Sequence, residues 1–483
     1  AGRTYDMRTA LCVSALVLLL QSPGLLFQAG FQLSFGAVLA LGAAEPVAEQ
    51  WLRAGSGPQK VLTAAVVIQL ATCPVILHHN FEYPVYGIFL NLAVIPLMSW
   101  VLLSGILGTV FGAVEIRLGM AAVGTGHYIL EFYQWLCEKT LKLPGAILVT
   151  GKPALWQTGV YGLAWVLFLA AAAVCVRREK ERKKAGEETA GFCRRRGLFL
   201  AVFAAGTLAV LMVRIPPKGM EVTFLDVGQG DGVCIRTEDV VILVDAGSSD
   251  KKNLGEQVLE PFLKSQGVSR VDYVVVSHGD QDHISGIREI LEGDLGIRVD
   301  HVILPWLGRE EGDEVYDRLE RGARVHGAEV TWMRRGDGLI AGPLELRCLY
   351  AGQERGSGKS GDRNDHSLLL LVRYGAAGIL LTGDMSREGE LAWVEQGDRP
   401  LVQVLKVAHH GSAYSSAEEF LLRVSPGLAV ISCGKNNRYG HPAPETLKRL
   451  EDLGIPFAVT DAAGSVTVRT DGLRLRAERF REP

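Results

Sequence analysis

Two histidines and two aspartates fall within six positions of the stretch SHGDQDH, residues 277–283, which directly follows the apolar run VDYVVV. Four ionisable side chains at the end of a strand are poor core material, but they can present ligands at the edge of a sheet. His278 and Asp280 could turn to one cation, and the adjacent Asp282 and His283 could turn to a second. Two metal ions about 3.5–4 Å apart suit the hydrolysis of phosphate esters, because they acidify water and offset the charge that builds on the phosphate.

Several other apolar runs end in polar residues of the same kind. VVILVDAG ends near Asp245, AGILLTGD ends in Asp384, and VQVLKVAHHGS ends in His409 and His410. If these runs are strands that end on one edge of a sheet, their terminal residues converge on a single site. Asp384 could then bridge two ions through its two oxygens, whereas Asp245 alone is equally compatible with a turn or a helix cap.

The composition of the chain, 48% hydrophobic and 21% charged, averages over two unlike halves. Residues 1–213 are mostly apolar, and residues 214–483 resemble an ordinary soluble domain. The net charge of -3 excludes a global basic field, and the eight scattered cysteines exclude a cysteine-built metal site or disulfide scaffold. Because the sequence begins at Ala1 without a signal segment, we expect it to start inside a longer protein.

The first half contains uncharged runs long enough to cross a bilayer, which takes about 20 residues. We predict spans at residues 154–176, 197–213, 85–112 (with a possible break at Pro96), 60–77 and 10–27, and weaker candidates at 31–44 and 120–137. Buried helices of a soluble protein are the alternative. The loop at 177–196 carries nine Lys and Arg residues and should be cytoplasmic, which places everything after about residue 214 on the extracytoplasmic side of the membrane.

The second half alternates short β-rich runs with helical patterns from residue 219 onward. Helices are expected near 252–265, 284–292, 310–322, 386–396, 415–423 and 444–453. Two mixed sheets flanked by helices, an αββα sandwich, would accommodate this order.

These motifs carry a family resemblance. SHGDQDH resembles the His-x-His-x-Asp-His signature of the metallo-β-lactamase superfamily, with Asp280 in the place of the second His. Together with FLDVGQGD (224–231), LVDAGS (243–248), LTGD (381–384), KVAHHGS (406–412), NRYGHP (437–442), GFQLSF (30–35) and NLAVIPL (91–97), it looks like the ComEC/Rec2 competence proteins. That family places a polytopic membrane domain before a metallo-β-lactamase-like domain; its usual N-terminal OB-like region is absent from this sequence.

The resemblance implies DNA uptake in natural transformation at the plasma membrane. Residues 1–213 would form a channel for single-stranded DNA, and residues 214–483 a nuclease that degrades the other strand of the incoming duplex. The implied partners are DNA, the lipid bilayer, other competence proteins such as a DNA receptor and a cytoplasmic translocation ATPase, and further copies of this chain. The alternatives are a membrane-anchored hydrolase of another phosphoester and a channel with a non-catalytic DNA-binding domain.

The resemblance also assigns the metal ligands. His278 and Asp280 would hold the first ion, Asp282 and His283 the second, with Asp384 bridging. His409 would be a further ligand, with His410 as its competitor. Asp280 makes the first site harder, which shifts preference from Zn²⁺ toward Mn²⁺ or Mg²⁺.

Other residues would act on the reaction or the substrate. Asp282, His283, Asp384 and His441 would form the catalytic set, with His441 completing the second ion site or contacting the scissile phosphate. The expected substrate-binding residues are Gln229, Asp231, Asn364, Ser367, Ser412 and His410. Asn364 and Ser367 carry the resemblance in NDHSLLL, and a ligand role for His366 stays open.

The stretch GSGKS, residues 356–360, evokes a phosphate-binding P-loop. The pattern requires a glycine at position 353, where this chain has Gln353, and the following residues GDRND do not predict a helix. We therefore expect a flexible basic loop, in which Arg355, Lys359 and Arg363 could contact a DNA backbone.

Overall fold

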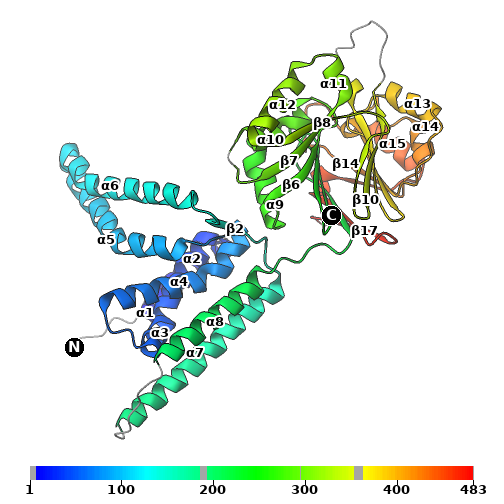
Figure 1. The fold of residues 1–483 in the computed structure, drawn as a ribbon. Coiled ribbons are helices and arrows are strands. Elements are labelled where there is room, and N and C mark those ends of the chain that lie inside the picture. The colour runs from blue at the N-terminus through cyan, green and yellow to red at the C-terminus, as the bar shows by residue number, and fades with distance from the viewer. Residues whose placement is uncertain (1–6, 185–192, 294, 353–362, 482–483) are drawn as a thin grey trace. The chain divides into compact units, whose positions relative to one another are not determined.

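The computed structural model describes residues 7–184, 193–293, 295–352 and 363–481. The chain divides into two compact units, one of residues 1–214 and 264–267 and the other of residues 215–263 and 268–483 (Figure 1). The GSGKS stretch and residues 185–192 of the basic loop lie outside the described residues.

The first unit is almost entirely helical. Its elements are α1 (Met7–Gln21), η1 (Pro23–Phe27), α2 (Ala29–Ala43), α3 (Glu45–Leu52), α4 (Gly57–Asn80), β1 (Glu82–Pro84), α5 (Gly87–Gly112), α6 (Ile116–Leu141), β2 (Ile147–Val149), α7 (Leu155–Lys184) and α8 (Cys193–Met212). The two short strands pair antiparallel with each other.

Four of the described helices, α4, α5, α7 and α8, are long and apolar enough to cross a membrane, or five spans if the bent pair α2 and α3 counts as one. Only 6% of the most apolar stretch of α5 is buried inside the structure. Such an apolar exterior argues against helices buried in a soluble protein and suits a lipid environment.

Two predicted spans differ from the structure. Residues 10–27 form the 15-residue helix α1 and the 3₁₀ turn η1, because Ser22 and Pro23 interrupt the run, and neither piece has the length of a span. The helix α5 continues through Pro96, so the break expected there is absent from this element.

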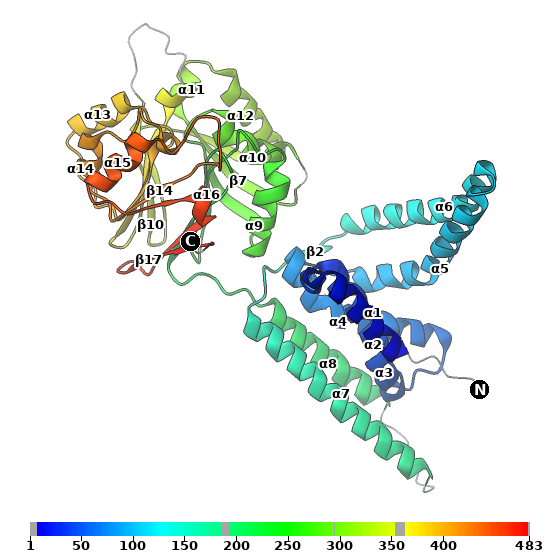
Figure 2. The same cartoon turned by 180° about the vertical axis from the view of Figure 1, so that it is seen from behind.

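Helices α5 and α6 form an antiparallel pair that packs through small residues (Figure 2). Ser104, Gly108 and Gly112 recur every fourth residue on α5. A Cβ atom built on Gly119 of α6 would lie 2.6 Å from the Cα atom of Gly112, and one built on Gly126 would lie 2.2 Å from the hydroxyl oxygen of Ser104. Without side chains at these positions the two backbones can approach closely, as helices in lipid commonly do.

The second unit is built on an eight-stranded sheet and a seven-stranded sheet. The first sheet has the order β17 (Leu475–Arg479), β16 (Val466–Thr470), β3 (Met220–Phe224), β4 (Gly232–Arg236), β5 (Val241–Ala246), β6 (Arg270–Val275), β7 (Arg298–Pro305), β8 (Glu329–Met333). The second has the order β15 (Phe457–Val459), β14 (Leu428–Ile431), β13 (Val404–Lys406), β12 (Ala377–Leu381), β11 (Leu368–Tyr374), β10 (Leu344–Ala351), β9 (Gly338–Ala341). Both sheets are mixed: β5 to β8 are parallel in the first, and β12 to β15 in the second.

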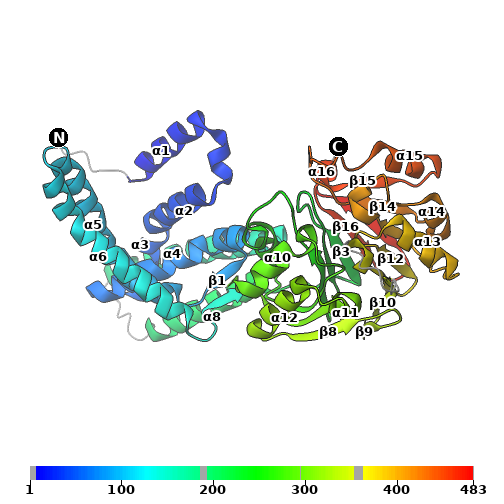
Figure 3. The ribbon, with the colours of Figure 1, turned by 90° about the horizontal axis from the view of Figure 1, so that it is seen from above.

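Helices cover the outer face of each sheet (Figure 3). The helical elements are η2 (Gly255–Leu259), α9 (Glu260–Ser265), α10 (Gln281–Glu292), α11 (Trp306–Glu310), α12 (Glu314–His326), η3 (Arg363–His366), α13 (Arg387–Glu395), η4 (Ala408–Gly411), α14 (Glu418–Val424), α15 (Pro444–Asp452) and α16 (Thr460–Ala463). One core lies between the sheets, and a separate core lies between each sheet and its helices. The predicted αββα sandwich is therefore confirmed.

The strands that end at the site are well buried, which fixes the positions of their ends. Strands β6, β12 and β13 have sheet neighbours on both sides, and every residue of β12 and β13 is buried. Strands covered on both faces read as continuous apolar runs, which AGILL of β12 shows and which β13 shows except at Lys406. The polar residues that directly follow such strands are therefore held in fixed positions.

Candidate metal centre

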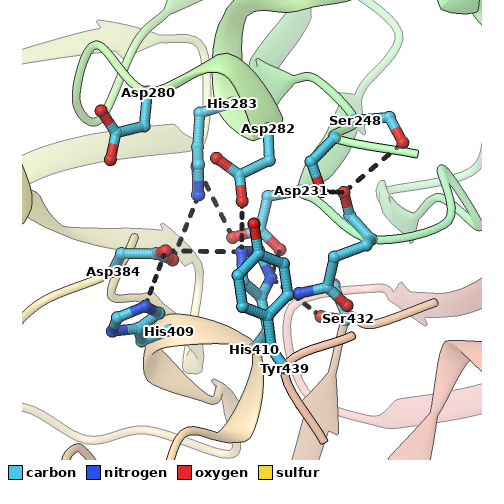
Figure 4. A network of polar contacts seen from close by, with 12 residues as sticks. Asp231, Ser248, Asp280, Asp282, His283, Asp384, His409, His410, Ser432 and Tyr439 are labelled. Atoms are coloured by element: carbon cyan, nitrogen blue, oxygen red, sulfur yellow. Dashed lines mark hydrogen bonds and ion pairs between the residues drawn. The ribbon is translucent and has the colours of Figure 1, made fainter. Parts of the chain in front are cut away.

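Residues from four strand ends meet at one edge of the sandwich (Figure 4). In the first sheet, Asp245 is the next-to-last residue of β5. The segment after β6 leads through His278 into α10, which carries Asp282 and His283. In the second sheet, Asp384 follows β12 and His410 follows β13. The convergence expected from the sequence is thus found in the structure.

Four side chains form a compact cluster: Asp282, His283, Asp384 and His410, one ligand atom from each lying within 4.8 Å of the others. Asp384 lies between the two sheets' histidines, with one oxygen 3.1 Å from His283 Nε2 and the other 3.4 Å from His410 Nε2. Asp282 Oδ2 is also 3.4 Å from His410 Nε2. Mixed nitrogen and oxygen donors at this spacing suit a divalent transition-metal ion.

Three histidine rings are oriented by what their Nδ1 atoms contact. His283 Nδ1 donates to Asp245 Oδ2 at 3.0 Å, and His410 Nδ1 donates to the main-chain carbonyl of Ser432 at 3.0 Å. In both rings the proton is therefore on Nδ1, which leaves the Nε2 lone pair available as a ligand.

The orientation of His278 follows from the hydroxyl of Ser277. Ser277 Oγ donates its one proton to Asp245 Oδ2 at 2.7 Å. The Nδ1 atom of His278 lies 3.1 Å from Ser277 Oγ. Since that hydroxyl can only accept from the imidazole, His278 also carries its proton on Nδ1. Asp245, which the sequence left open as a turn residue, thus sets the tautomers of two histidines.

The Nε2 atoms of all three rings are buried and have no hydrogen-bond partner among the described residues. The same holds for Asp384 Oδ1. The close contacts of these four buried atoms within the described part of the chain are ion pairs among the centre's own residues, and leaving them without hydrogen bonds would be costly, since buried polar groups normally form them. A divalent cation would satisfy these atoms together, so the residues present fit a metal.

Burial and the surrounding charges shift the pKa values of the three histidines in different directions. Burial opposes the charged form of His283, but the carboxylates of Asp384 and Asp245 outweigh it and raise the pKa of this ring well above its usual range. Asp384 and Asp231 likewise raise the pKa of His410 against its burial. Burial and the neighbouring His283 hold the pKa of His278 well below its usual range. Protons and a metal ion therefore compete for the positions beside His283 and His410.

A second acidic group lies on the inner side of the cluster. Asp231, Asp245 and His283 also bring ligand atoms within 4.8 Å of one another, but Lys406 already forms a buried ion pair with Asp231. Burial opposes ionisation of Asp231, and the ammonium of Lys406 overcomes it and lowers the pKa of the carboxyl. Because an ammonium compensates this group, the cluster of Asp282, His283, Asp384 and His410 is the better metal position. Sequence reasoning missed Lys406, whose only signal is a lysine inside an otherwise apolar strand.

Two glycines let the main chain of the first sheet lie directly against the start of α10. A Cβ atom on Gly230 would lie 2.6 Å from the carbonyl oxygen of Asp282, and one on Gly247 would lie 2.4 Å from the amide nitrogen of His283. The amide of Asp231 donates to the carbonyl of Asp282 at 3.0 Å, and the amide of Gly247 donates to the carbonyl of Asp231 at 2.9 Å. The turn that carries two ligands is thereby bonded to the sheet through its backbone.

The remaining predicted ligands lie on the exposed side of the cluster. Asp280 Oδ2 is 3.8 Å from His278 Nε2, and its side chain is 36% exposed. His409 Nε2 is 3.8 Å from Asp384 Oδ2, with 33% of its side chain exposed. Of the two adjacent histidines it is therefore His410, predicted as the competitor, that lies in the compact cluster. Both have left-handed backbone angles (φ 49° and 54°), a strained conformation often found at functional sites.

His441 stacks near these histidines, its ring centre 5.7 Å from that of His409 and 6.3 Å from that of His410. Burial, His410 and His409 lower the pKa of His441 to about 4. The ring is therefore neutral at physiological pH.

The predicted substrate-binding residues have varied surroundings. Ser367 Oγ accepts from the amide of Asp384 at 3.2 Å, so it positions Asp384. Gln229 Oε1 accepts from the amide of Gly434 at 3.2 Å, and Ser412 Oγ accepts from the amide of Tyr414 at 3.3 Å. The carbonyl of Asn364 accepts from the amide of Ser367 within the turn η3. These bonds show local structural roles.

His366, left open as a ligand, is engaged elsewhere. Its Nδ1 lies 3.2 Å from the hydroxyl of Tyr316 and its Nε2 lies 2.8 Å from Glu311 Oε2. Both ring nitrogens are thus occupied by partners outside the cluster.

Family models match both parts of the chain. Residues 1–174 match the Competence protein model, and residues 225–435 match the Metallo-beta-lactamase superfamily model. The chain therefore combines these two domains, which confirms the resemblance drawn from its motifs.

Curated relatives match nearly all of the chain. It is 28% identical over 477 residues to ComE operon protein 3 of Bacillus subtilis (strain 168), covering 95% of this chain and 58% of that protein. It is 30% identical over 478 residues to Competence protein ComA of Neisseria gonorrhoeae, covering 96% of this chain and 59% of that protein. The chain thus spans about three fifths of the length of these relatives. Among solved structures, the metallo-beta-lactamase fold protein YhfI from Bacillus subtilis matches with a TM-score of 0.35 and 14% identity, covering 50% of this chain and 96% of that one.

Proposed function

Because the chain joins a Competence protein domain to a metallo-beta-lactamase superfamily domain, we propose that it acts in DNA uptake during natural transformation. Its helical unit conducts single-stranded DNA across the plasma membrane. Its sandwich unit hydrolyses phosphodiester bonds of the strand that is not transported. Incoming duplex DNA is the substrate, and a DNA receptor, a translocation ATPase and further copies of the chain are the proposed partners.

The observation that carries the hydrolytic part is the set of three buried histidines whose Nε2 atoms face two carboxylates without other partners among the described residues. A purely structural site has no reason to keep these atoms unpaired, whereas a divalent ion uses them all. Bound there, such an ion would supply Lewis acidity to water and to the phosphate oxygens. A non-catalytic DNA-binding domain would not require this arrangement.

The ligands fall into an inner and an outer set. We assign His283, Asp282, His410 and Asp384 to one ion, and His278, Asp280 and Asp384 to a second, with His409 beside it. The outer set contains two carboxylates, the partly exposed Asp280 and the buried Asp384, and one histidine, so Mn²⁺ or Mg²⁺ is a better candidate there than Zn²⁺. Asp384 would serve both, because its Oδ2 atom lies 3.4 Å from His410 Nε2 in the first set and 3.8 Å from Nε2 of His409, which lies beside the second.

The chain's own residues hold the ligand rings in place and contact the substrate. Asp245 and the carbonyl of Ser432 hold the rings of His283 and His410 so that no reorganisation is needed on binding. His441 is neutral near pH 7, because its pKa is lowered to about 4. It therefore acts as a hydrogen-bond partner of a phosphate oxygen, and the leaving oxygen takes its proton from water.

The sandwich unit lies on the extracytoplasmic side in this proposal. The basis is the basic loop at 177–196, which precedes the last apolar helix α8. Duplex DNA arriving from outside would then meet the hydrolytic site before the membrane. Single cysteines placed at Arg474 and at Arg178 in a cysteine-free background test this: in intact cells only the first should react with a membrane-impermeant maleimide.

The decisive experiment uses the whole chain in detergent with labelled single- and double-stranded DNA. Metals are removed with a chelator and Mn²⁺, Mg²⁺ or Zn²⁺ is returned singly, with Asp282→Ala as the inactive variant and Asp452→Ala, an exposed residue at the end of α15, as the control. Cleavage that depends on metal and is lost only in Asp282→Ala supports the nuclease. Hydrolysis of bis(p-nitrophenyl) phosphate without cleavage of DNA would replace it with a hydrolase of another phosphoester. Metal binding without any hydrolysis would favour a binding domain.

A further inference from the structure

A polar groove of about 470 Å³ borders the candidate metal centre on the outside of the first sheet. It lies between α10 and the start of α12, two helices that pack side by side (Figure 3). Three arginines line it, Arg288, Arg318 and Arg363, together with Gln281 and the acidic residues Asp313 and Glu314.

The groove begins at the turn that carries the ligands. Gly279 and Gln281, which flank Asp280 in the chain, are both part of its wall. Arg363 Nη1 lies 3.4 Å from Asp280 Oδ1, so the groove and the metal centre share this carboxylate as a boundary.

The groove then follows one face of α10. Gln281, Ile284 and Arg288 line it at spacings of three and four residues, which places them on the same side of a helix. At about 1.5 Å of rise per residue, Arg288 lies roughly 10 Å along the helix from Gln281. Each strand of a nucleic acid duplex carries one phosphate about every 3.4 Å along the axis, so a few phosphates match this length.

Two of the three arginines keep their charge available to a ligand. Arg363 is held by Asp313, with its Nε 2.5 Å from Oδ2, and Asp313 also accepts from the amide of Val315 at the start of α12. Among the described residues Arg288 pairs with the exposed Glu292, at 3.4 Å one turn along, and surface pairs of this kind are weak. The side chain of Arg318 is exposed.

We propose that this groove binds the sugar–phosphate backbone of a nucleic acid strand beside the bond to be cut, with Arg288 and Arg318 contacting phosphates that flank the scissile one. The inference rests on the proposed nuclease function and specifies how a polymer is chosen over a small phosphoester. A phospholipid headgroup or a mononucleotide has no flanking phosphates to reach these arginines. Arg363 positions Asp280 and Asp313 and is not itself assigned a phosphate.

The test compares two substrates on the whole metal-loaded chain: a labelled oligonucleotide and bis(p-nitrophenyl) phosphate, which has a single phosphate. The variant is the double substitution Arg288→Ala/Arg318→Ala. The control is Arg321→Ala/Arg324→Ala, which removes the same charge from exposed positions of α12 outside the groove. We expect the ratio of kcat/KM for the oligonucleotide to kcat/KM for the small diester to fall about 10-fold in the groove variant, through KM, and the log–log salt slope of oligonucleotide binding to fall by roughly 2.

A substitution of opposite sign sharpens the test. Glu314 is an exposed acid on the groove wall, so Glu314→Gln should lower KM for the oligonucleotide severalfold at low salt. A general loss of fold cannot improve binding, so this result would exclude a folding artefact.

A second readout separates failure of the groove from failure of the proposed function. Anisotropy of a fluorescein-labelled oligonucleotide with the chelated chain measures binding without catalysis, and Arg288→Ala/Arg318→Ala should raise Kd about 10-fold there too. An unchanged Kd in that variant, or an equal loss in the control pair, would overturn the groove. If wild type binds through these arginines yet cleaves no DNA with any metal, the nuclease proposal fails and the groove stands.

Discussion

In the first sheet the ring of His283 is held by a side chain, the carboxylate of Asp245, whereas in the second sheet the ring of His410 is held by a main-chain carbonyl, that of Ser432. Both arrangements leave Nε2 free to face Asp384. The first sheet supplies the buried negative charge of Asp231 and Asp245, and the second supplies the compensating ammonium of Lys406. The comparison shows that two halves with similar strand order orient equivalent rings by different means: the first uses a charged side chain, and the second uses a neutral main-chain carbonyl.

The largest expected effect is on the ion pair that joins the halves. Lys406→Met leaves Asp231 ionised and buried without its partner, which should destabilise the sandwich by about 3–5 kcal/mol. Asp231→Asn in the same chain should recover roughly 1–3 kcal/mol, because the two substitutions are coupled. Urea unfolding in detergent, followed by intrinsic fluorescence, measures both. Purely additive losses would show that the halves are joined by apolar packing alone.

Asp384 is the carboxylate through which both halves meet. Asp384→Asn removes the negative charge between His283 and His410, and hydrolysis should fall roughly 10²- to 10³-fold, as when one electrostatic group of an active site is deleted. Metal content and turnover of the purified chain are the measurements. Asp398→Asn, at a partly exposed ion pair with Arg335, is the matched control and should behave as wild type. Full activity of Asp384→Asn would remove this residue from the centre.

A buried acid away from the cluster tests whether the second half also tunes charge. Burial raises the pKa of Glu390 to about 7, although the amides of Ser416 and Ala417 bond to its oxygens at 2.7 Å. Because this pKa lies above the value of 4.5 for a free glutamate, its contribution to stability is complete below about pH 4.5 and is lost as the pH rises through about 7. Between pH 5 and 8 wild type should lose roughly 2 kcal/mol more than Glu390→Gln.

Urea midpoints across that pH range give the Glu390 result, with the exposed Glu388→Gln on the same helix as control. Parallel curves for wild type and Glu390→Gln would mean that Glu390 is ionised throughout.

The smallest expected effect is a loss of metal affinity, and it distinguishes the ring held by a carboxylate from the ring held by a main-chain carbonyl. Asp245→Asn weakens the hold on His283 and His278 but leaves His410 untouched, and metal affinity should fall about 10- to 100-fold. Asp272→Asn, on neighbouring β6 and bonded to the amide of Val241, is the control. Competition with a metal-sensitive dye measures the affinity. No change in Asp245→Asn would show that packing, and not this carboxylate, sets the rings.

The sequence predicted the sandwich and the meeting of Asp282, His283 and Asp384, because strand ends and polar spacing are local signals. It did not separate His409 from His410, since that choice depends on two consecutive left-handed residues and on a carbonyl 22 positions away. It also missed Lys406 and the full role of Asp245, because their partners are brought together only by the fold. In the helical unit, hydropathy predicted the spans α4, α5, α7 and α8. It also predicted a span at residues 10–27, where the helix α1 ends at Gln21, just before Ser22 and Pro23.

The backbone bonds that tie Asp282 through Asp231 to Gly247 have a consequence in time. A turn fixed in this way cannot open by itself, so the amides of Asp231 and Gly247 should exchange their hydrogens with solvent only when the whole sandwich unfolds. The partly exposed side chains of Asp280 and His409, in contrast, leave the outer face accessible without any opening. Ions should therefore enter and leave while the protein stays folded. The residence time of a metal would then depend on how strongly its ligands bind it and not on the rate at which the protein opens.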